Sequence, residues 1–156
     1  MRFDFYDLKA ESTDSALLDL LERIIASKKK TIIVLKDESE TERVNDWLWQ
    51  YDEESFIPHG SKKDGNEKMQ TIYLADAEEF KNNKRISPNS ASFIIYMSVL
   101  ISDIPDKNLY ERCFVIFGNR NRMELENARI LWKAAKESGG EMHLWRNDGK
   151  WREASL

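Results

Sequence analysis

The sequence predicts an α/β protein that forms a single three-layer domain with a mostly parallel sheet over residues 1–156. Three observations support this fold class. Segments typical of strands alternate with segments typical of helices, which is the pattern of parallel sheets. Several strand segments are continuous apolar runs, as expected for strands covered on both faces. A chain of 156 residues is also long enough to bury one ordinary core.

The amino-terminal part of the chain predicts two strand–helix units. Residues 3–8 indicate a short aromatic strand. Ser12 is a helix cap, and the apolar residues after it recur at helical spacing up to a run of three lysines. Residues 31–35 form a β-branched run typical of a buried strand. Residues 39–42, Ser-Glu-Thr-Glu, form a capping box that predicts a second helix through about Gln50.

The middle of the chain alternates polar segments with apolar ones. We predict a long loop over residues 51–68, a short strand over 71–74, and a polar excursion with one helical turn over 75–91. Residues 93–97 and 113–117 are apolar runs that predict two more buried strands.

The last part of the chain predicts a long helix and a closing strand or hairpin. The helix covers residues 122–137, and the hairpin joins residues 142–145 to Trp151, which makes five to seven strands in all. The loop after the first strand, residues 7–12, contains no glycine, so its backbone cannot approach a phosphate closely. We therefore expect a Rossmann-like sheet that lacks a nucleotide-binding loop, and no cofactor.

The charge of the chain argues against direct binding of nucleic acid. The net charge is -4 at pH 7 and the isoelectric point is about 5.3, whereas sequence-independent binding to nucleic acid needs a basic surface. The charge is unevenly distributed, because residues 1–60 hold 8 basic and 14 acidic side chains and residues 112–156 hold 9 basic and 6 acidic ones. The two ends of the chain are therefore suited to different partners.

Cysteine and histidine are too rare for a disulfide or a structural zinc site. Cys113 is the single cysteine, and His59 and His143 are the two histidines. The amino terminus has no apolar run of the kind found in signal peptides, and no segment approaches the ~18 apolar residues of a membrane span. We expect a cytoplasmic protein without a membrane contact, and Cys113 as an inert core residue.

One arrangement of residues suggests an enzyme. His59 follows Asp52, Glu53 and Glu54, so a small α/β hydrolase or nuclease that uses His59 and nearby carboxylates is the alternative interpretation. A single loop histidine among carboxylates is more often a solvated or capping group. We therefore expect no catalytic residues.

Two groups of residues are typical of partner-binding surfaces. Trp49 lies one step past Leu48, at the border of the apolar stripe of the predicted second helix, and we expect it to be partly exposed. Phe56, Ile57 and Pro58 place apolar groups in an otherwise polar loop. Exposed aromatic residues of this kind mark protein-binding hot spots, unless they fold back over an edge of the sheet.

The second group lies on the predicted last helix. Arg129 and Lys133 stand four residues apart and share a helix face, with Trp132 beside them and Lys136 one turn further. Such a strip fits a phosphate backbone, an acidic peptide or simply solvent. The net negative charge of the chain favours the peptide over the polyanion.

Several segments resemble the chi subunit family of bacterial DNA polymerase III. The resemblance runs in order along nearly the whole chain and rests on residues 3–6, 43–49, 54–60, 128–133 and 139–151. The most specific part runs from Leu48-Trp49 to Ser55-Phe56-Ile57-Pro58-His59. Two places depart from the family: residues 61–91 have little of its character, and residues 113–118 lack its common aspartate.

The resemblance implies a non-catalytic accessory subunit of the clamp-loader complex. Proteins of this family bind the acidic C-terminal tail of single-stranded DNA-binding protein, and a separate surface binds the psi subunit. Carried onto this sequence, the tail site comprises Arg129, Lys133, Trp132 and Phe117.

The psi-facing surface carried over from the family comprises Trp49, Phe56, Ile57 and Pro58. If the source organism has no psi subunit, these residues are expected to serve another clamp-loader component, a helicase or a self-contact.

Overall fold

The protein is an α/β domain built on one sheet. The computed structural model describes residues 1–9, 12–50, 57–147 and 150–154, and its eight strands have the order β3-β4-β2-β5-β6-β1-β7-β8. All neighbouring strands are parallel except β7 and β8, which form the predicted hairpin. The strands are β1 (Arg2–Leu8), β2 (Thr31–Leu35), β3 (His59–Ser61), β4 (Ile72–Asp76), β5 (Phe93–Met97), β6 (Arg112–Gly118), β7 (Glu141–Asn147) and β8 (Trp151–Glu153).

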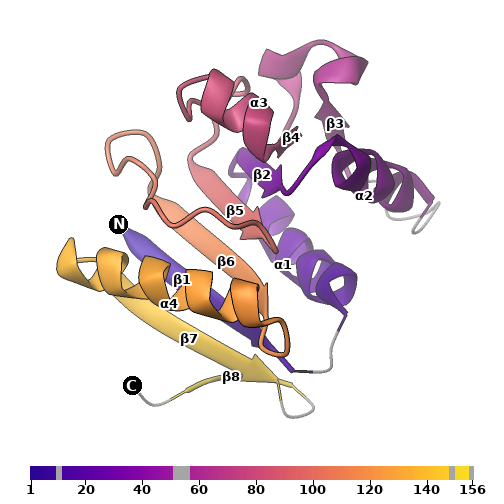
Figure 1. The fold of residues 1–156 in the computed structure, drawn as a ribbon. Helices are drawn as coiled ribbons and strands as arrows, with labels where there is room; N and C mark the ends of the chain where they lie inside the picture. The colour runs from indigo at the N-terminus through magenta and orange to yellow at the C-terminus, as the bar shows by residue number, and fades with distance from the viewer. Residues whose placement is uncertain (10–11, 51–56, 148–149, 155–156) are drawn as a thin grey trace.

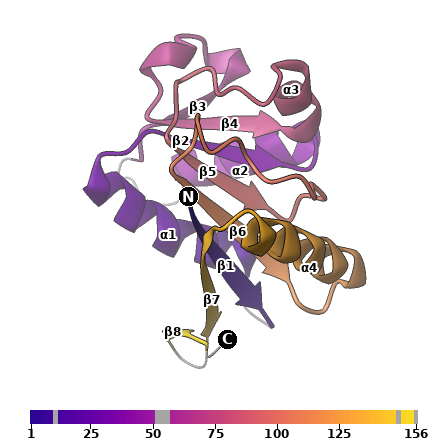
Figure 2. The same ribbon diagram turned by 90° about the vertical axis from the view of Figure 1, so that its left-hand side faces the viewer.

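Helices cover both faces of the sheet, which confirms the three-layer prediction. They are α1 (Thr13–Ser27), α2 (Glu38–Gln50), α3 (Ala77–Asn82) and α4 (Arg122–Glu137). Apolar residues of α1 and α2 pack in one core cluster, and those of α3 and α4 pack in a second cluster on the opposite face. Figure 2 shows α1 and α4 on opposite sides of the sheet. Alternate residues of β2 enter the two clusters, which explains its uninterrupted apolar run.

The helix boundaries agree closely with the sequence, with one shift at the start of α2. Ser12 caps α1 as predicted, because its side chain accepts a hydrogen bond from the Asp14 N–H. At α2 the cap is Asp37 and not Ser39, since the Asp37 carboxylate accepts from the Glu40 N–H at 2.8 Å. The helix therefore begins at Glu38, ahead of the predicted capping box.

The predicted loop at residues 51–68 was wrong in part, because it contains strand β3. His59–Ser61 pairs in parallel with β4 at the edge of the sheet, and two 3-10 turns, Lys62–Asp64 and Glu67–Met69, follow it. The strand has three residues and includes Gly60, so it carries no apolar periodicity that could identify it. With this strand the sheet has eight strands among the described residues, one more than the upper limit of the prediction.

The carboxyl ends of β1 and β6 form a switch point in the sheet. These two strands are adjacent and parallel, but β1 leads to α1 on one face whereas β6 leads to α4 on the other. The arrowheads of β1, β6 and β7 lie at the same edge, where α4 begins (Figure 1). In open α/β sheets the connections diverge at such a point and leave a crevice for a ligand.

Candidate functional site

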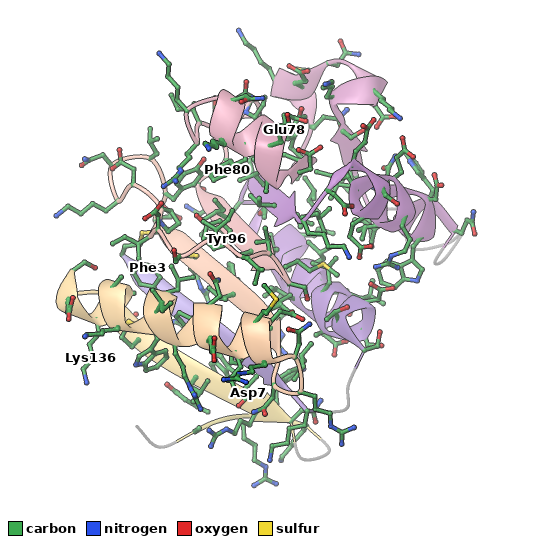
Figure 3. The ribbon with its side chains drawn as sticks, in the orientation of Figure 1. Phe3, Asp7, Glu78, Phe80, Tyr96 and Lys136 are labelled. Carbon is green, nitrogen blue, oxygen red and sulfur yellow. The ribbon has the colours of Figure 1, made fainter. Side chains whose placement is uncertain are left out.

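A groove of about 340 Å³ lies between α4 and the carboxyl ends of β1, β6 and β7. Its walls combine apolar, basic and amide side chains. They belong to Phe5, Asp7, Phe117, Asn119, Leu125, Ala128, Arg129, Trp132, Leu144 and Arg146. In Figure 3, Asp7 lies by the first turns of α4, and Lys136 lies at the other end of this helix.

Helix α4 supplies one wall. Its N-cap is Asn121, whose side chain accepts from the Glu124 N–H. Ala128 is buried against the sheet together with the other small and apolar residues of that helix face, so Arg129 is left exposed beside it. Trp132 is half-buried and presents its ring to Phe5 in an edge contact, with the two centroids 5.0 Å apart. The helix thus places a cation and an indole on one side of the groove.

The strands supply an apolar floor. Phe5 and Phe117 belong to the same core cluster as the buried residues of α4, and Leu144 packs against that cluster. The pairing of β1 with β7 places Phe5 opposite Leu144. Since alternate residues of a strand share a face, the same pairing brings the next residues on this face, Asp7 and Arg146, together at the end of the groove.

The polar end of the groove is organised around Asp7. This carboxylate is 4% exposed. One of its oxygens accepts from the Asn119 side-chain amide at 2.8 Å, and the other accepts from Arg146 Nε at 3.3 Å. Asn119 is itself fixed, because its backbone N–H donates to the Leu8 carbonyl at 2.7 Å. The Arg146 side chain stays 53% exposed.

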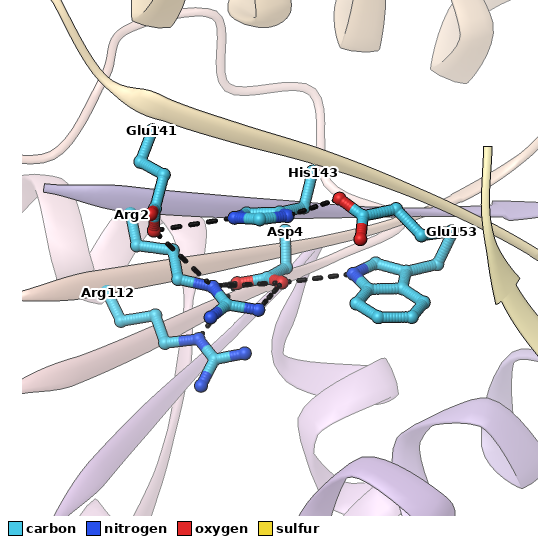
Figure 4. A network of polar contacts seen from close by, with 7 residues as sticks. Arg2, Asp4, Arg112, Glu141, His143 and Glu153 are labelled. Carbon is cyan, nitrogen blue, oxygen red and sulfur yellow. Dashed lines mark hydrogen bonds and ion pairs between the residues drawn. The ribbon is translucent and has the colours of Figure 1, made fainter. Parts of the chain in front are cut away.

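A hydrogen-bond network on the opposite face of the sheet holds strand β7, which carries Leu144 and Arg146 of the groove, in place (Figure 4). Asp4, which is fully buried, accepts from Arg112 Nε at 2.8 Å, from Arg2 Nη2 at 3.0 Å and from the indole N–H of Trp145 at 3.0 Å. Burial alone would raise the pKa of the Asp4 carboxyl, but the hydrogen bonds from Arg112, Arg2 and Trp145 outweigh it and lower this pKa below its usual value. The ionised Asp4 therefore fastens β7 to β1.

The structure brings together three of the four residues predicted for the tail site. Phe117, Arg129 and Trp132 all line the groove, and Lys133 is exposed on α4, four residues after Arg129. Within the part of the chain that the structure describes, no ion pair or hydrogen bond involves the guanidinium of Arg129 or the ammonium of Lys133. Both cations are thus available to an acidic ligand.

Sequence reasoning missed Arg146, Asp7 and Asn119. Met142, Leu144 and Arg146 alternate along β7, so the strand period could have placed Arg146 on the groove face. Its contact with Asp7, 139 positions away, had no signal in the sequence.

The four residues predicted for the psi-facing surface lie in different surroundings. Trp49 is 48% exposed at the end of α2, and its ring centroid is 4.5 Å from that of His59. Ile57 is 5% exposed and belongs to the core, so it has almost no surface to offer a partner, and Pro58 is half-buried. Phe56 lies outside the described residues.

His59 is not the solvated or capping group that the sequence suggested. It is 4% exposed, its Nδ1 lies 2.7 Å from the Ile57 carbonyl oxygen, and its Nε2 lies 3.2 Å from the Asn45 carbonyl oxygen. Each ring nitrogen thus faces a backbone carbonyl oxygen, one just ahead of β3 and one within α2, and a neutral ring can donate a hydrogen bond to one of the two. The carboxylates of the alternative catalytic site, at positions 52–54, fall outside the described residues.

Cys113 has the surroundings expected of a core residue. It is fully buried, and this burial, with a smaller contribution from the charge of Asp4, raises the pKa of its thiol.

Comparison with known proteins identifies the family. Residues 1–143 match the family model of the DNA polymerase III chi subunit, HolC. The chain belongs to the DNA polymerase III chi subunit family. A protein named "Probable DNA polymerase III subunit chi" from Rickettsia prowazekii (strain Madrid E) is 36% identical over 97 residues, which are 62% of this chain and 54% of that relative. The chain thus matches about half the length of this curated relative.

Two further observations describe this chi-family chain. Among the residues with described positions, no group of three or more His, Cys, Asp or Glu side chains is arranged to hold a metal ion. None of the described helices is both long and apolar enough to cross a bilayer.

Proposed function

We propose that this chi-family protein is a non-catalytic adaptor in DNA replication, and that its groove binds the acidic C-terminal tail of single-stranded DNA-binding protein. The observation that carries the proposal is the convergence of Arg129, Trp132 and Phe117 on one groove, although they come from two different elements. The family membership of the chain supports a role in the polymerase III assembly.

The chemistry of the groove fits an acidic peptide with an apolar end. The Arg129 guanidinium can bind a carboxylate through two parallel hydrogen bonds, and Lys133 adds a point charge for further acidic residues. The floor formed by Phe5, Phe117 and Leu144 can bury an apolar side chain. A contact of this size is weak and weakens further with salt, but several tails on one DNA-coated assembly raise the effective concentration.

Titration of the protein with a synthetic acidic tail peptide tests this proposal. Arg129→Ala should lower the affinity at least about tenfold, since it removes charge-assisted hydrogen bonds. Arg122→Ala is the matched control, because Arg122 also lies on α4 but is 90% exposed and pairs with Glu126 outside the groove. Equal peptide affinity in the wild type and in the Arg129 variant would refute the proposal.

The second contact of the proposed adaptor is with psi or another clamp-loader component. We assign it to Trp49 together with Phe56 and with Ile57 and Pro58, which follow Phe56 directly in the sequence. The half-exposed indole of Trp49 supports this assignment, because large aromatic residues at the surface dominate the binding energy of protein interfaces. This contact should depend less on salt than the tail groove, since it is mainly apolar.

A further inference from the structure

We propose that Arg146 of β7 is a second tail-binding cation, and that its pairing with the buried carboxylate of Asp7 keeps the groove attractive to an acidic ligand. This inference rests on the proposed tail-binding function of the same groove. It adds a residue from a strand to a basic site that the sequence located on α4 alone.

Arg146 is suited to bind an anion across the groove from Arg129. Both side chains line the groove, one from β7 and the other from α4. The single hydrogen bond of the Arg146 guanidinium among the described residues uses Nε, at 3.3 Å from Asp7. A guanidinium carries five N–H donors, so the four on its terminal nitrogens remain for a ligand. The side chain is 53% exposed and thus accessible.

Asp7 gives Arg146 a second role. A carboxylate that is 4% exposed and lines a groove would repel an acidic peptide if its charge were unmatched, because little water screens it. Asn119 donates a hydrogen bond to Asp7 but brings no charge. Arg146 is the cation that neutralises Asp7, since no other ion pair of Asp7 involves the described residues.

Because Arg146 has these two roles, the effects of substituting Arg146 and Asp7 on the affinity for the tail should not be additive. Arg146→Ala removes a ligand contact and also leaves the negative charge of Asp7 unmatched in the groove. In the double variant Arg146→Ala/Asp7→Asn, the side chain at position 7 keeps its size and can still bond to Asn119 but carries no charge. The double variant should therefore bind the tail more tightly than Arg146→Ala alone, although it has one more substitution.

The experiment is a fluorescence titration of the full chain with a labelled synthetic peptide that has several aspartates and an apolar C-terminal residue. At low salt, Arg146→Ala should weaken binding at least about tenfold, and the double variant should regain part of that loss. Raising the salt should affect Arg146→Ala less than the wild type, because one attractive charge is gone. Arg122→Ala serves again as the control on α4.

The outcomes separate this inference from the proposed function. If Arg129→Ala weakens binding but Arg146→Ala stays within about twofold of the wild type, the inference is wrong and the tail groove stands. If neither variant changes the affinity, the groove does not bind the tail at all. A double variant that binds no better than Arg146→Ala would overturn the role given to Asp7. Should thermal unfolding show that Arg146→Ala is unstable, Arg146→Gln replaces it, since glutamine keeps part of the aliphatic stem and removes the charge.

Discussion

Asp4 is a carboxylate without exposed surface that accepts hydrogen bonds from two arginines and an indole. Removing such an acceptor would leave the donors of Arg2 and Arg112 partly unsatisfied beside the core. Because Trp145 belongs to β7, the same change would loosen the strand that carries Leu144 and Arg146 into the groove. A residue on one face of the sheet thus supports a binding surface on the other.

This arrangement predicts a pH dependence of stability. The folded-state pKa of Asp4 is lowered, so Asp4 stabilises the fold above the unfolded-state pKa of about 4, and this contribution is lost as the pH falls through the lower folded value. Asp4→Asn should lower the free energy of unfolding by about 2 kcal/mol at pH 7. Urea denaturation at pH 7 and at pH 3 measures the effect, and the difference between the wild type and the variant should shrink at pH 3. Parallel pH profiles of the two proteins would contradict this interpretation.

At the start of α2, the capping residue that the sequence predicts differs from the one in the structure. Ser39 heads the apparent capping box, whereas Asp37 makes the capping hydrogen bond, and its carbonyl oxygen also accepts from the Thr41 N–H at 3.0 Å. Both residues are acceptable caps by type, so the local sequence could not decide between them. The last turn of the same helix carries Trp49 of the proposed partner surface.

Substitution of the two candidate caps tests this assignment. Asp37→Ala should lower the free energy of unfolding by about 1 kcal/mol, because it leaves an N–H of the first turn without its partner. Ser39→Ala should change it by less than about 0.5 kcal/mol, since Ser39 is an exposed residue within the helix. Thermal or urea unfolding of the two variants provides the comparison. A larger loss for Ser39→Ala would restore the capping box as the start of the helix.

The two proposed binding surfaces lie on different faces of the whole molecule. The apolar residues of α2, which carries Trp49, pack into the cluster shared with α1, whereas the groove lies on the face covered by α4. An adaptor needs such a separation, because it must bind two partners at the same time.

This geometry predicts that the surfaces act independently. Trp49→Ala should weaken binding to psi, or to the clamp-loader component that replaces it, by about tenfold or more, and should leave the affinity for the acidic tail peptide unchanged. Parallel titrations of one protein sample with each partner measure both effects. A simultaneous loss of both affinities, with a lowered melting temperature, would show that Trp49 stabilises the fold instead.

The sequence by itself determined the fold class, most of the strands and helices, and two of the α4 residues that line the groove, Arg129 and Trp132. The apolar run of β2 and the four-residue spacing of Arg129 and Lys133 on α4 are local patterns, and a local pattern can be recognised without knowledge of the fold. Strand β3 could not be predicted in this way, because a strand of three residues that includes Gly60 shows no alternation of apolar and polar residues. The burial of Ile57 and His59 could not be predicted either, because it depends on how the chain packs around β3.

Only the tertiary structure decided how the groove is completed. Asp7 and Arg146 are 139 positions apart, and they meet because β7 pairs with β1 in a parallel register that places one opposite the other. Asn119 joins them because β6 lies on the other side of β1. The order of strands in a sheet is set by packing over the whole domain, so a site at its carboxyl edge combines residues that no sequence window contains.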